Sequence, residues 1–390
     1  MGIDGLSQFI RKEFPAAVCE INSSELSIKA VGIDVLHWVI SNTRAILPSL
    51  APNDVTDQEV DRTKVVDTLI RNLSSRILKL LRSKILPVFI FEGEAPPEKQ
   101  ITRDHRRQER EDDRQTMDQL RQELSSMEPA LRPSGKMAQL RKLYCSLYYC
   151  NEYEMTAIRT FLHSLGIPCI QSNQEAERTG SILCREGVLG GVMTSDSDVL
   201  AHGADLLIRE VGELTIDPLT GNECVRLSVI KLPMILQACG FTKEMWRDFC
   251  IMCGNDYGPN IPGIGPGRSF KLIQQHLSIN QIPDGRIEQL NFERQRQLFN
   301  YIPSSQTITT QPGQPLIPDF NPGALISSRD ALTVYSLEKY IQSYLDLYLS
   351  LNLAYWVDGY LVSTGVIRIV PPVQHKSVGL VINLGGLKLK

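Results

Sequence analysis

Acidic residues at or after the ends of predicted strands, together with Asp256 at the start of a Gly/Pro-rich stretch, are the part of this sequence best suited to chemistry. They stand in VGIDV, FIFEGE, NQEAER, TSDSDV and GNDYG, and they are Asp34, Glu92, Glu175, Glu177, Asp196, Asp198 and Asp256. A single acid after a strand is more often a helix cap or a solvated loop residue. Several at one edge of a sheet would repel each other and raise each other's pKa unless cations neutralise them.

The donor set indicates which metal would fit. Carboxylate oxygens suit Mg²⁺ or Mn²⁺, whereas a Zn²⁺ site would need His or Cys ligands. Two such ions about 3.5 to 4 Å apart can clamp a phosphodiester, so the acids predict phosphoryl chemistry. Cys250 and Cys253 form a CxxC pair, but no second pair accompanies them. We therefore expect two buried thiols there and no zinc site.

A charge-dense segment without Gly or Pro lies between Pro97 and Pro129. At about 100° per residue, its basic side chains fall on one side of a helix. These side chains are Lys99, Arg103, Arg106, Arg107, Arg110 and Arg114. The ordinary alternative is a solvated surface helix held by ion pairs between successive turns. Like charges along one face favour instead a polyanion as the partner of this helix.

These side chains need a scaffold, and the sequence predicts an α/β fold with a mostly parallel sheet. Short apolar, β-branched runs alternate with helical stretches, as in βαβ units. The predicted strands are 29–35, 85–91, 166–170, 190–195 and 205–211. Ligands bind such sheets beyond the carboxyl ends of the strands. Residues 136–165 are predicted to form one long helix, whose tyrosines favour core packing over base stacking.

The composition of the whole chain limits its partners. The chain has 390 residues, 42% hydrophobic content and a formal net charge of -3. Any polyanion must therefore be bound by local basic patches. The 9 cysteines lack framework spacing, which indicates reduced thiols inside a cell. No signal peptide, membrane span or acylation signal is recognisable, so we expect a soluble protein.

The segment 252–273, MCGNDYGPNIPGIGPGRSFKLI, contains more Gly and Pro than a simple turn needs. It does not fit the dinucleotide-binding motif GxGxxG, because Arg268 takes the place of the third glycine. No GK[ST] follows for a phosphate-binding P-loop. A plain glycine-rich turn remains an alternative.

Taken together, these motifs resemble the flap endonuclease and XPG-type family of structure-specific 5′ nucleases. MGIDGL, VGIDV, FIFEGEAPPEK, QEAER, TSDSDVLAHG and GNDYGPNIPGIGPGRSFKLI occur in the family's order, over residues 1 to about 300. The resemblance implies a PIN-like fold with a helical arch at about 97–140 and a helix-three-turn-helix motif at about 246–276. It also implies Mg²⁺-dependent hydrolysis of DNA at 5′ flaps, nicks or gaps, in replication, repair or recombination.

The resemblance gives roles to individual residues. The acids would hold two Mg²⁺ or Mn²⁺ ions, and Lys99 and Arg106 would steer the scissile phosphate. Further DNA contacts would come from the amine left after removal of the initiator Met, from the arch and from the helix-three-turn-helix loop. These residues are Gly2, Arg103, Arg107, Arg110, Gly263, Gly265, Gly267, Arg268 and Lys271. Carbonyls of the loop would bind K⁺, and a free 5′ end would pass through the arch.

Some positions depart from the family pattern. Glu92 replaces an Asp, which moves the carboxylate by about 1.5 Å, the length of one carbon–carbon bond. Ile40 stands where an aromatic residue often stacks on the substrate base, with Trp38 or His37 as local substitutes. Gly267 replaces a basic residue common in the loop. We expect catalysis to survive these changes.

The last ninety or so residues do not follow the family. We predict a linker at 301–330, then an α+β extension at 331–390 with an amphipathic helix at 332–351 and a β-hairpin. QRQLFNYI, at 295–302, weakly resembles a sliding-clamp peptide, but core packing is the preferred interpretation.

Alternative functions stay open at this point. The chain is a flap endonuclease, a 5′-to-3′ exonuclease of the same family, or a non-catalytic DNA-junction binding protein whose metal site Glu92 has altered. The arch is longer than the reduced cap of junction resolvases and shorter than the insert of the repair-incision branch. We expect a monomer that binds branched or flapped DNA and no membrane. The expected compartment is the nucleus, with a cytoplasmic viral factory as the alternative.

Overall fold

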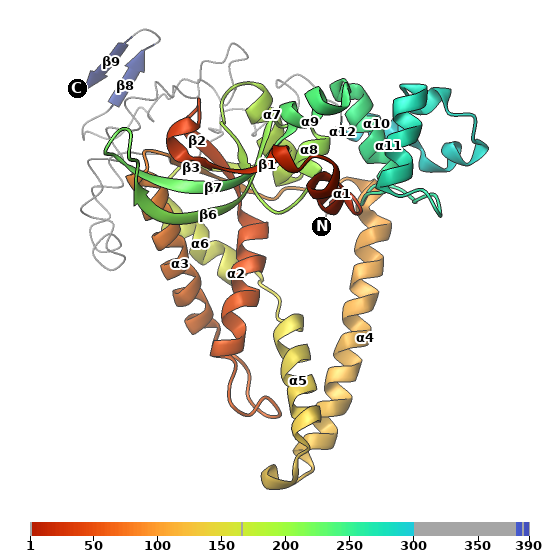
Figure 1. Ribbon diagram of the computed structural model, residues 1–390. Coiled ribbons are helices and arrows are strands. Elements are labelled where there is room, and N and C mark those ends of the chain that lie inside the picture. Colours follow the sequence, from red (N-terminus) through yellow and green to blue (C-terminus); the bar gives the residue numbers. More distant parts are fainter. Residues whose placement is uncertain (1, 165–166, 300–379, 384–385, 390) are drawn as a thin grey trace.

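A mixed sheet of seven strands forms the centre of the molecule (Figure 1). The structure is a computed structural model, and it describes residues 2–164, 167–299, 380–383 and 386–389. The strands of the sheet are β1 (Val18–Asn22), β2 (Ala30–Asp34), β3 (Leu86–Phe91), β4 (Cys169–Gln171), β5 (Val192–Met193), β6 (Leu206–Ile216) and β7 (Glu223–Lys231). Two further strands, β8 (Leu380–Asn383) and β9 (Gly386–Leu389), pair with each other antiparallel.

The strand order of the sheet is β1-β7-β6-β5-β2-β3-β4. The strands from β6 to β4 run parallel, whereas β7 lies antiparallel to both β6 and β1. The chain moves outward from β2 to β3 and β4, and then returns to the other side of β2 at β5. Ligands bind at such a change of direction. The predicted α/β fold with a mostly parallel sheet is confirmed, and each predicted strand overlaps one of β2 to β6; β1 and β7 were not predicted.

Helices cover both faces of the sheet. They are α1 (Leu6–Glu13), α2 (Val35–Leu50), α3 (Arg62–Arg82), α4 (Gln100–Ser125), α5 (Ser134–Leu147), α6 (Glu152–Ser164), α7 (Ala176–Arg185), α8 (Asp198–Ala201), α9 (Leu232–Cys239), α10 (Lys243–Cys253), α11 (Pro266–His276) and α12 (Phe292–Phe299). Helices α2 and α3 pack on β3, and α7 packs on β2, β3 and β5 from the other side (Figure 1). Every residue of β2 and β3 is buried, as expected for strands covered on both faces.

Helices α4 and α5 form an arch that projects from this body (Figure 1). With 26 residues, α4 is about 39 Å long, and only Leu124 of its side chains is buried. A small apolar cluster joins the far end of the arch to the α2–α3 connection. Its buried members are Ala51, Val55, Leu124, Leu140 and Tyr144. The arch is therefore attached to the body at both ends.

The prediction of one long helix over 136–165 is wrong. The chain leaves the helix after Leu147 and starts α6 at Glu152. Asn151 begins α6 with reciprocal bonds: its side chain accepts from the backbone N–H of Tyr153 at 2.8 Å, and its own N–H donates to Glu154 at 2.8 Å. This Asn-x-x-Glu pattern is a capping signal that the sequence carried. The break leaves Tyr148 and Tyr149 outside both helices.

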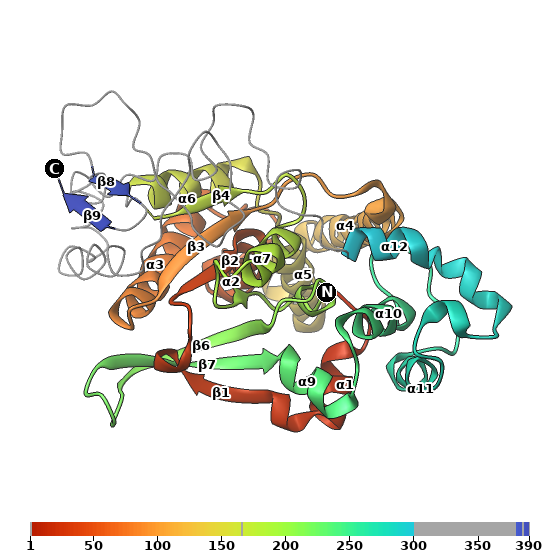
Figure 2. The ribbon, with the colours of Figure 1, turned by 90° about the horizontal axis from the view of Figure 1, so that it is seen from above.

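The helices α10, α11 and α12 gather at one end of the molecule, beside α1 (Figure 2). Residues 254–265 connect α10 to α11, where the helix-three-turn-helix motif is predicted. No helix in the described ranges is long and apolar enough to cross a bilayer. The predicted linker and amphipathic helix lie outside the described residues, as does the predicted hairpin around AYWVDGYLV, whereas β8 and β9 fall in the β-prone end of the chain.

Candidate active site

The acidic residues meet at the carboxyl ends of the parallel strands. Asp34 ends β2 and caps α2, where it accepts from the N–H of His37 at 3.0 Å and from Thr194 at 3.1 Å. Glu92 follows β3, and Asp196 follows β5. The cause is the topology, because neighbouring parallel strands end at the same edge.

Three of the carboxylates form the centre of the group. One oxygen each of Glu177, Asp196 and Asp198 lies within 4.8 Å of the others, and all three residues are buried. Asp198 is fully buried, and neither of its carboxylate oxygens has a hydrogen-bond partner in the described chain. A buried carboxylate without donors is costly. These residues fit a divalent cation, which would supply the missing charge and fill the vacant coordination of the oxygens.

The pKa values show that burial and mutual repulsion disfavour the ionised form of these carboxylates. Burial raises the pKa of Asp34 to about 6 and that of Glu92 to about 7, and neighbouring carboxylates add to both shifts. Burial also raises the pKa values of Glu177 and Asp198 well above the usual range. Among the neighbouring charges, Glu175 has the largest effect on Glu177, and Asp196 has the largest effect on Asp198. The arrangement therefore favours either bound protons or bound cations.

Glu92, the departure from the family pattern, is fixed at the edge of this group. Its Oε2 accepts from the backbone N–H of Ala176, at the start of α7, at 3.0 Å. It is not among the three residues whose oxygens cluster within 4.8 Å. The longer side chain thus reaches the helix terminus with one oxygen and keeps the other for a ligand.

Two basic side chains from the base of the arch enter the carboxylate group. The Lys99 ammonium is paired with Glu175 and lies 3.8 Å from Glu177 and 3.6 Å from Asp256. Arg106 donates from Nη2 to both carboxylate oxygens of Asp256, at 2.8 and 3.0 Å. Burial alone would lower the pKa of Lys99, but Glu177 and Glu175 raise it, so the ammonium stays charged. Both predicted basic residues therefore lie beside the acids.

The N-terminus packs directly on the carboxylates. Gly2 has φ 91°, and a Cβ there would lie 2.2 Å from Oδ1 of Asp196. The N–H of Ile3 donates to Ser197 at 3.0 Å, and that of Asp4 donates to the carbonyl of Gly254 at 2.9 Å. Only glycine fits this position. Gly2, predicted from the resemblance, is thus brought to the site.

The glycines of the α10–α11 connection leave their backbone open. A Cβ at Gly263, Gly265 or Gly267 would meet nothing within 4 Å, and Gly263 has φ 79°. Arg268 and Lys271 are exposed in the first turns of α11. This open backbone at a helix N-terminus and the nearby cations form a surface that suits a phosphate.

The other predicted basic residues of the arch lie away from the carboxylates. Arg103, Arg107 and Arg110 are exposed along α4, and Arg107 pairs with Asp104 at 2.6 Å. Ion pairs between helical turns, the ordinary alternative for a charged helix, therefore account for part of this face.

Two residues differ from what the sequence predicted: Tyr257 contributes to the site although it was not predicted, and Trp38 does not substitute for the missing aromatic residue. The hydroxyl of Tyr257 donates to Glu175 at 2.6 Å, and its position beside Asp256 in GNDYG is the signal that could have found it. Trp38 is 3% exposed and belongs to the core, so it cannot replace the aromatic residue missing at Ile40. His37 is half-buried, and its ring bonds to Ser41 at 3.1 Å.

Two weaker interpretations of the sequence are also resolved. Cys250 and Cys253 are buried, and burial raises the pKa of both thiols, as expected for core residues. Gln295, Leu298 and Phe299 are buried in α12, which agrees with core packing and leaves no exposed clamp peptide in this helix.

Comparisons with known proteins agree with this geometry. Residues 1–113 match the XPG N-terminal domain, and residues 166–256 match the XPG I-region. The chain is 30% identical over 284 residues to Flap endonuclease 1 of Cryptosporidium muris, covering 72% of this chain and 57% of that protein. It is 29% identical to Flap endonuclease 1 of Entamoeba histolytica, covering 72% and 69%. Against the Cryptosporidium proteins, the chain thus spans little more than half of the relative's length.

Solved structures share the fold. The catalytic core of Rad2 in complex with a DNA substrate gives a TM-score of 0.51 at 16% identity, covering 89% of this chain and 100% of that one. Flap endonuclease-1 from Methanococcus jannaschii gives 0.50 at 18% identity, covering 86% and 98%. At such low identity, these likenesses speak for the architecture alone.

Proposed function

Since this chain belongs to the XPG family of flap endonucleases, we propose that it hydrolyses phosphodiester bonds of branched DNA at 5′ flaps, nicks or gaps. The observation that carries the proposal is the buried cluster of Glu177, Asp196 and Asp198, faced by Lys99 and Arg106. Acids and bases so arranged suit a phosphodiester, because the acids hold cations and the bases attract the phosphate.

Two Mg²⁺ or Mn²⁺ ions, when bound, would supply the charge that activates water and stabilises the leaving oxygen. Asp34, Glu92, Glu175, Glu177, Asp196, Asp198 and Asp256 would hold them, directly or through water. Thr194 and Ala176 support this role, because they orient Asp34 and Glu92 by hydrogen bonds.

Lys99 and Arg106 would bind and orient the scissile phosphate. Both now balance carboxylates, and cations that take over Glu175 and Asp256 would free them. Each would then place a positive charge where negative charge develops on the phosphate. Their position at the first turns of α4 ties this step to the arch.

Duplex DNA would lie on the α10–α11 connection. The open backbone around Gly263, Gly265 and Gly267 lets a phosphate approach closely, and Arg268 and Lys271 add charge. We propose K⁺ as a ligand of carbonyls in this loop. A free 5′ end would pass through the arch toward its far side.

The test uses the full chain with a free Gly2 on a 5′-flap duplex, with Mg²⁺ or with EDTA. Asp198→Asn should lower the cleavage rate by at least roughly 100-fold, the loss typical of disturbing even the groups around a metal ligand. Asp67→Asn, an exposed acid on α3, is the matched control and should cleave normally. Circular dichroism would check that both variants are folded.

A duplex with a nick and no flap separates the endonuclease from the exonuclease of the same family. Preference for the flap supports the endonuclease, and stepwise shortening from the nick supports the exonuclease. Tight binding of DNA without any metal-dependent product would overturn both and leave a DNA-junction binding protein.

A further inference from the structure

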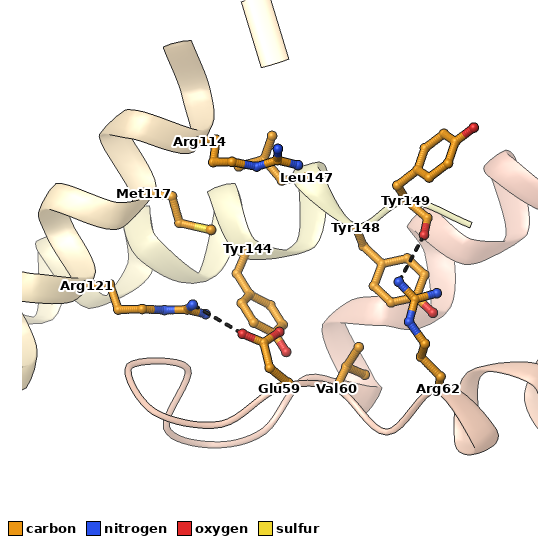
Figure 3. A pocket seen from close by; sticks show the side chains of 10 residues that line it. All are labelled: Glu59, Val60, Arg62, Arg114, Met117, Arg121, Tyr144, Leu147, Tyr148 and Tyr149. Carbon is orange, nitrogen blue, oxygen red and sulfur yellow. Dashed lines mark hydrogen bonds and ion pairs between the residues drawn. The ribbon is translucent and has the colours of Figure 1, made fainter. Parts of the chain in front are cut away.

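A cavity of about 470 Å³ lies where the arch meets the body (Figure 3). Side chains from α4, α5, the α5–α6 break and the start of α3 line it. They include Arg114, Arg121, Tyr144, Tyr148, Tyr149 and Arg62. Its size is that of a site for a small organic group. Guanidinium groups outnumber the one carboxylate of the lining, that of Glu59, so the cavity suits an anion that carries a flat ring.

One face of α4 leads from the active site to this cavity. Arg106, Arg110, Arg114, Met117 and Arg121 follow each other at intervals of three or four residues, so they share a face of the helix. Arg106 holds Asp256 at the base of the arch, and Arg114, Met117 and Arg121 line the cavity. A strand of phosphates that meets Arg106 and follows this face therefore arrives at the cavity.

Some of the lining groups already have partners and serve to shape the walls. Arg121 pairs with Glu59 at 3.2 Å. Arg62 pairs with the buried Glu154, lies over the ring of Tyr148 at 4.9 Å and donates to the carbonyl of Tyr149 at 3.3 Å (Figure 3). These contacts hold the backbone at the α5–α6 break in place.

Two exposed groups at the rim of the cavity are left for a ligand, and the ring of Tyr149 points outward from the other lining side chains (Figure 3). The side chain of Arg114 is 56% exposed, and within the described chain it pairs with Glu111 on its own helix, at 3.6 Å. Tyr149 is 63% exposed, although its carbonyl is held by Arg62. An exposed tyrosine on a fixed backbone presents a stacking surface at little cost in conformational entropy.

We propose that this cavity binds a nucleotide of the 5′ single strand, with its base on the ring of Tyr149 and its phosphate on Arg114. The inference rests on the proposed function, and it makes the far end of the arch a second contact for the flap. Stacking of this kind tolerates any base, because every base has a π-face.

The geometry sets the flap length that reaches the cavity. Arg114 and Arg121 lie about 12 and 22 Å along α4 from Arg106, at 1.5 Å per residue. Neighbouring phosphates of one strand are at least roughly 3.4 Å apart, so roughly four to seven nucleotides span these distances at most. A flap of a single nucleotide ends before the cavity.

The experiment measures the Kd of the full chain for duplexes that carry oligothymidine flaps of one or roughly ten nucleotides. Binding is followed by fluorescence anisotropy in the presence of EDTA, which prevents cleavage. Tyr149→Ala should weaken binding of the long flap by roughly fivefold or more, with Tyr149→Phe near wild type because the ring remains. Arg114→Gln should also weaken it. Tyr153→Ala and Arg71→Gln, at exposed positions outside the cavity, are the matched controls.

Each result has a definite meaning. The inference is supported if the variants lose affinity for the long flap only. An abasic site within roughly the fourth to seventh flap nucleotides should then weaken binding of wild type to a similar extent. Equal losses for both flap lengths, or no loss for either, overturn it. If the wild-type protein binds and cleaves flaps while the cavity variants change nothing, only this inference fails. If it binds no flapped duplex at all, the proposed function fails as well.

Discussion

The carboxylate of Asp198 has no hydrogen-bond donor among the described residues, and a buried group of this kind destabilises the fold that contains it. Functional sites often keep such groups at the expense of stability. At this position a bound proton or a bound cation would offset the cost.

Asp198→Asn should therefore change stability in opposite ways with and without metal. In EDTA at pH 8, the variant should have a free energy of unfolding equal to that of wild type or higher by about 1 kcal/mol, because a repelled charge is gone. Mg²⁺ should stabilise wild type by a further 2–3 kcal/mol or so at about 100 times its Kd, and the variant by less. Urea denaturation measures both. A variant that is less stable than wild type in EDTA would contradict this account.

Gly2 permits a second test on a single residue. Gly2→Ala places a methyl group against Asp196 and forces a left-handed backbone on alanine. Strain of roughly 1–3 kcal/mol should appear, either as a lower Tm or as displacement of the N-terminus with loss of cleavage. Gly135→Ala is the control, since a Cβ there meets nothing within 4 Å and α5 gains a better helix former. Equal behaviour of the two variants would show that the N-terminus does not press on the site.

Among the elements, the arch depends on contacts made far from its base. Arg132, between α4 and α5, donates to Asp54 of the α2–α3 connection at 2.7 Å. Arg141 of α5 donates to the carbonyls of Pro48, Ala51 and Pro52 at the end of α2. These polar contacts surround the apolar cluster that seats the arch.

The Asp54 contact should depend on pH. Bonds from Thr56 and Arg132 lower the pKa of Asp54 from its usual range to about 2. Since the folded value lies below the unfolded one, its stabilisation is present above about pH 4 and is lost as pH falls toward 2. Asp54→Asn should cost about 0.5–1 kcal/mol at pH 7, a small value because the group is partly exposed. Hydrogen exchange of the arch should show this difference, which should shrink below about pH 4 and vanish as the pH falls to about 2 or lower.

The sequence predicted those elements whose pattern is unambiguous. Strands β2 and β3 are buried at every residue, so their apolar runs stand out. β1 and β7 mix buried residues with partly or fully exposed ones, a weaker signal that gave no prediction. The break before α6 was missed because LYCSLYYC contains no Gly or Pro, although Asn151 and Glu154 supplied a cap.

The candidate site was predicted in part for the same reason. Acidic residues at strand ends can be recognised in the sequence, and they predict a site because the topology of a parallel sheet brings the strand ends together. The hydroxyl of Tyr257 meets Glu175 across 82 positions of the chain. The cavity beside Tyr149 combines side chains from three separate segments between Glu59 and Tyr149, which no local pattern joins. Such contacts become visible only in three dimensions.

At the scale of the whole molecule, the described elements that carry the site lie between α1 and α12. The large sheet runs from β1 to β7, and Leu298 and Phe299 close the core around α10. A chain shortened to residues 1–305 or so should therefore unfold cooperatively, with a Tm within about 4 °C of the full chain. It should also keep metal-dependent cleavage. Scanning calorimetry and the flap assay test this, and an aggregated or inactive short chain would show that later residues complete the enzyme.

Asp256 links the α10–α11 connection to the base of the arch by two contacts. Its carbonyl oxygen holds the hydroxyl of Thr102 at 3.1 Å, and its carboxylate holds Arg106. One residue of the α10–α11 connection thus fastens the base of α4 twice. A cation bound by this carboxylate would compete with Arg106 and leave the Thr102 bond in place, so in the proposed enzyme metal binding would loosen the base of the arch before any bond in the DNA breaks. The order of metal binding and release of the arch would then depend on this one side chain.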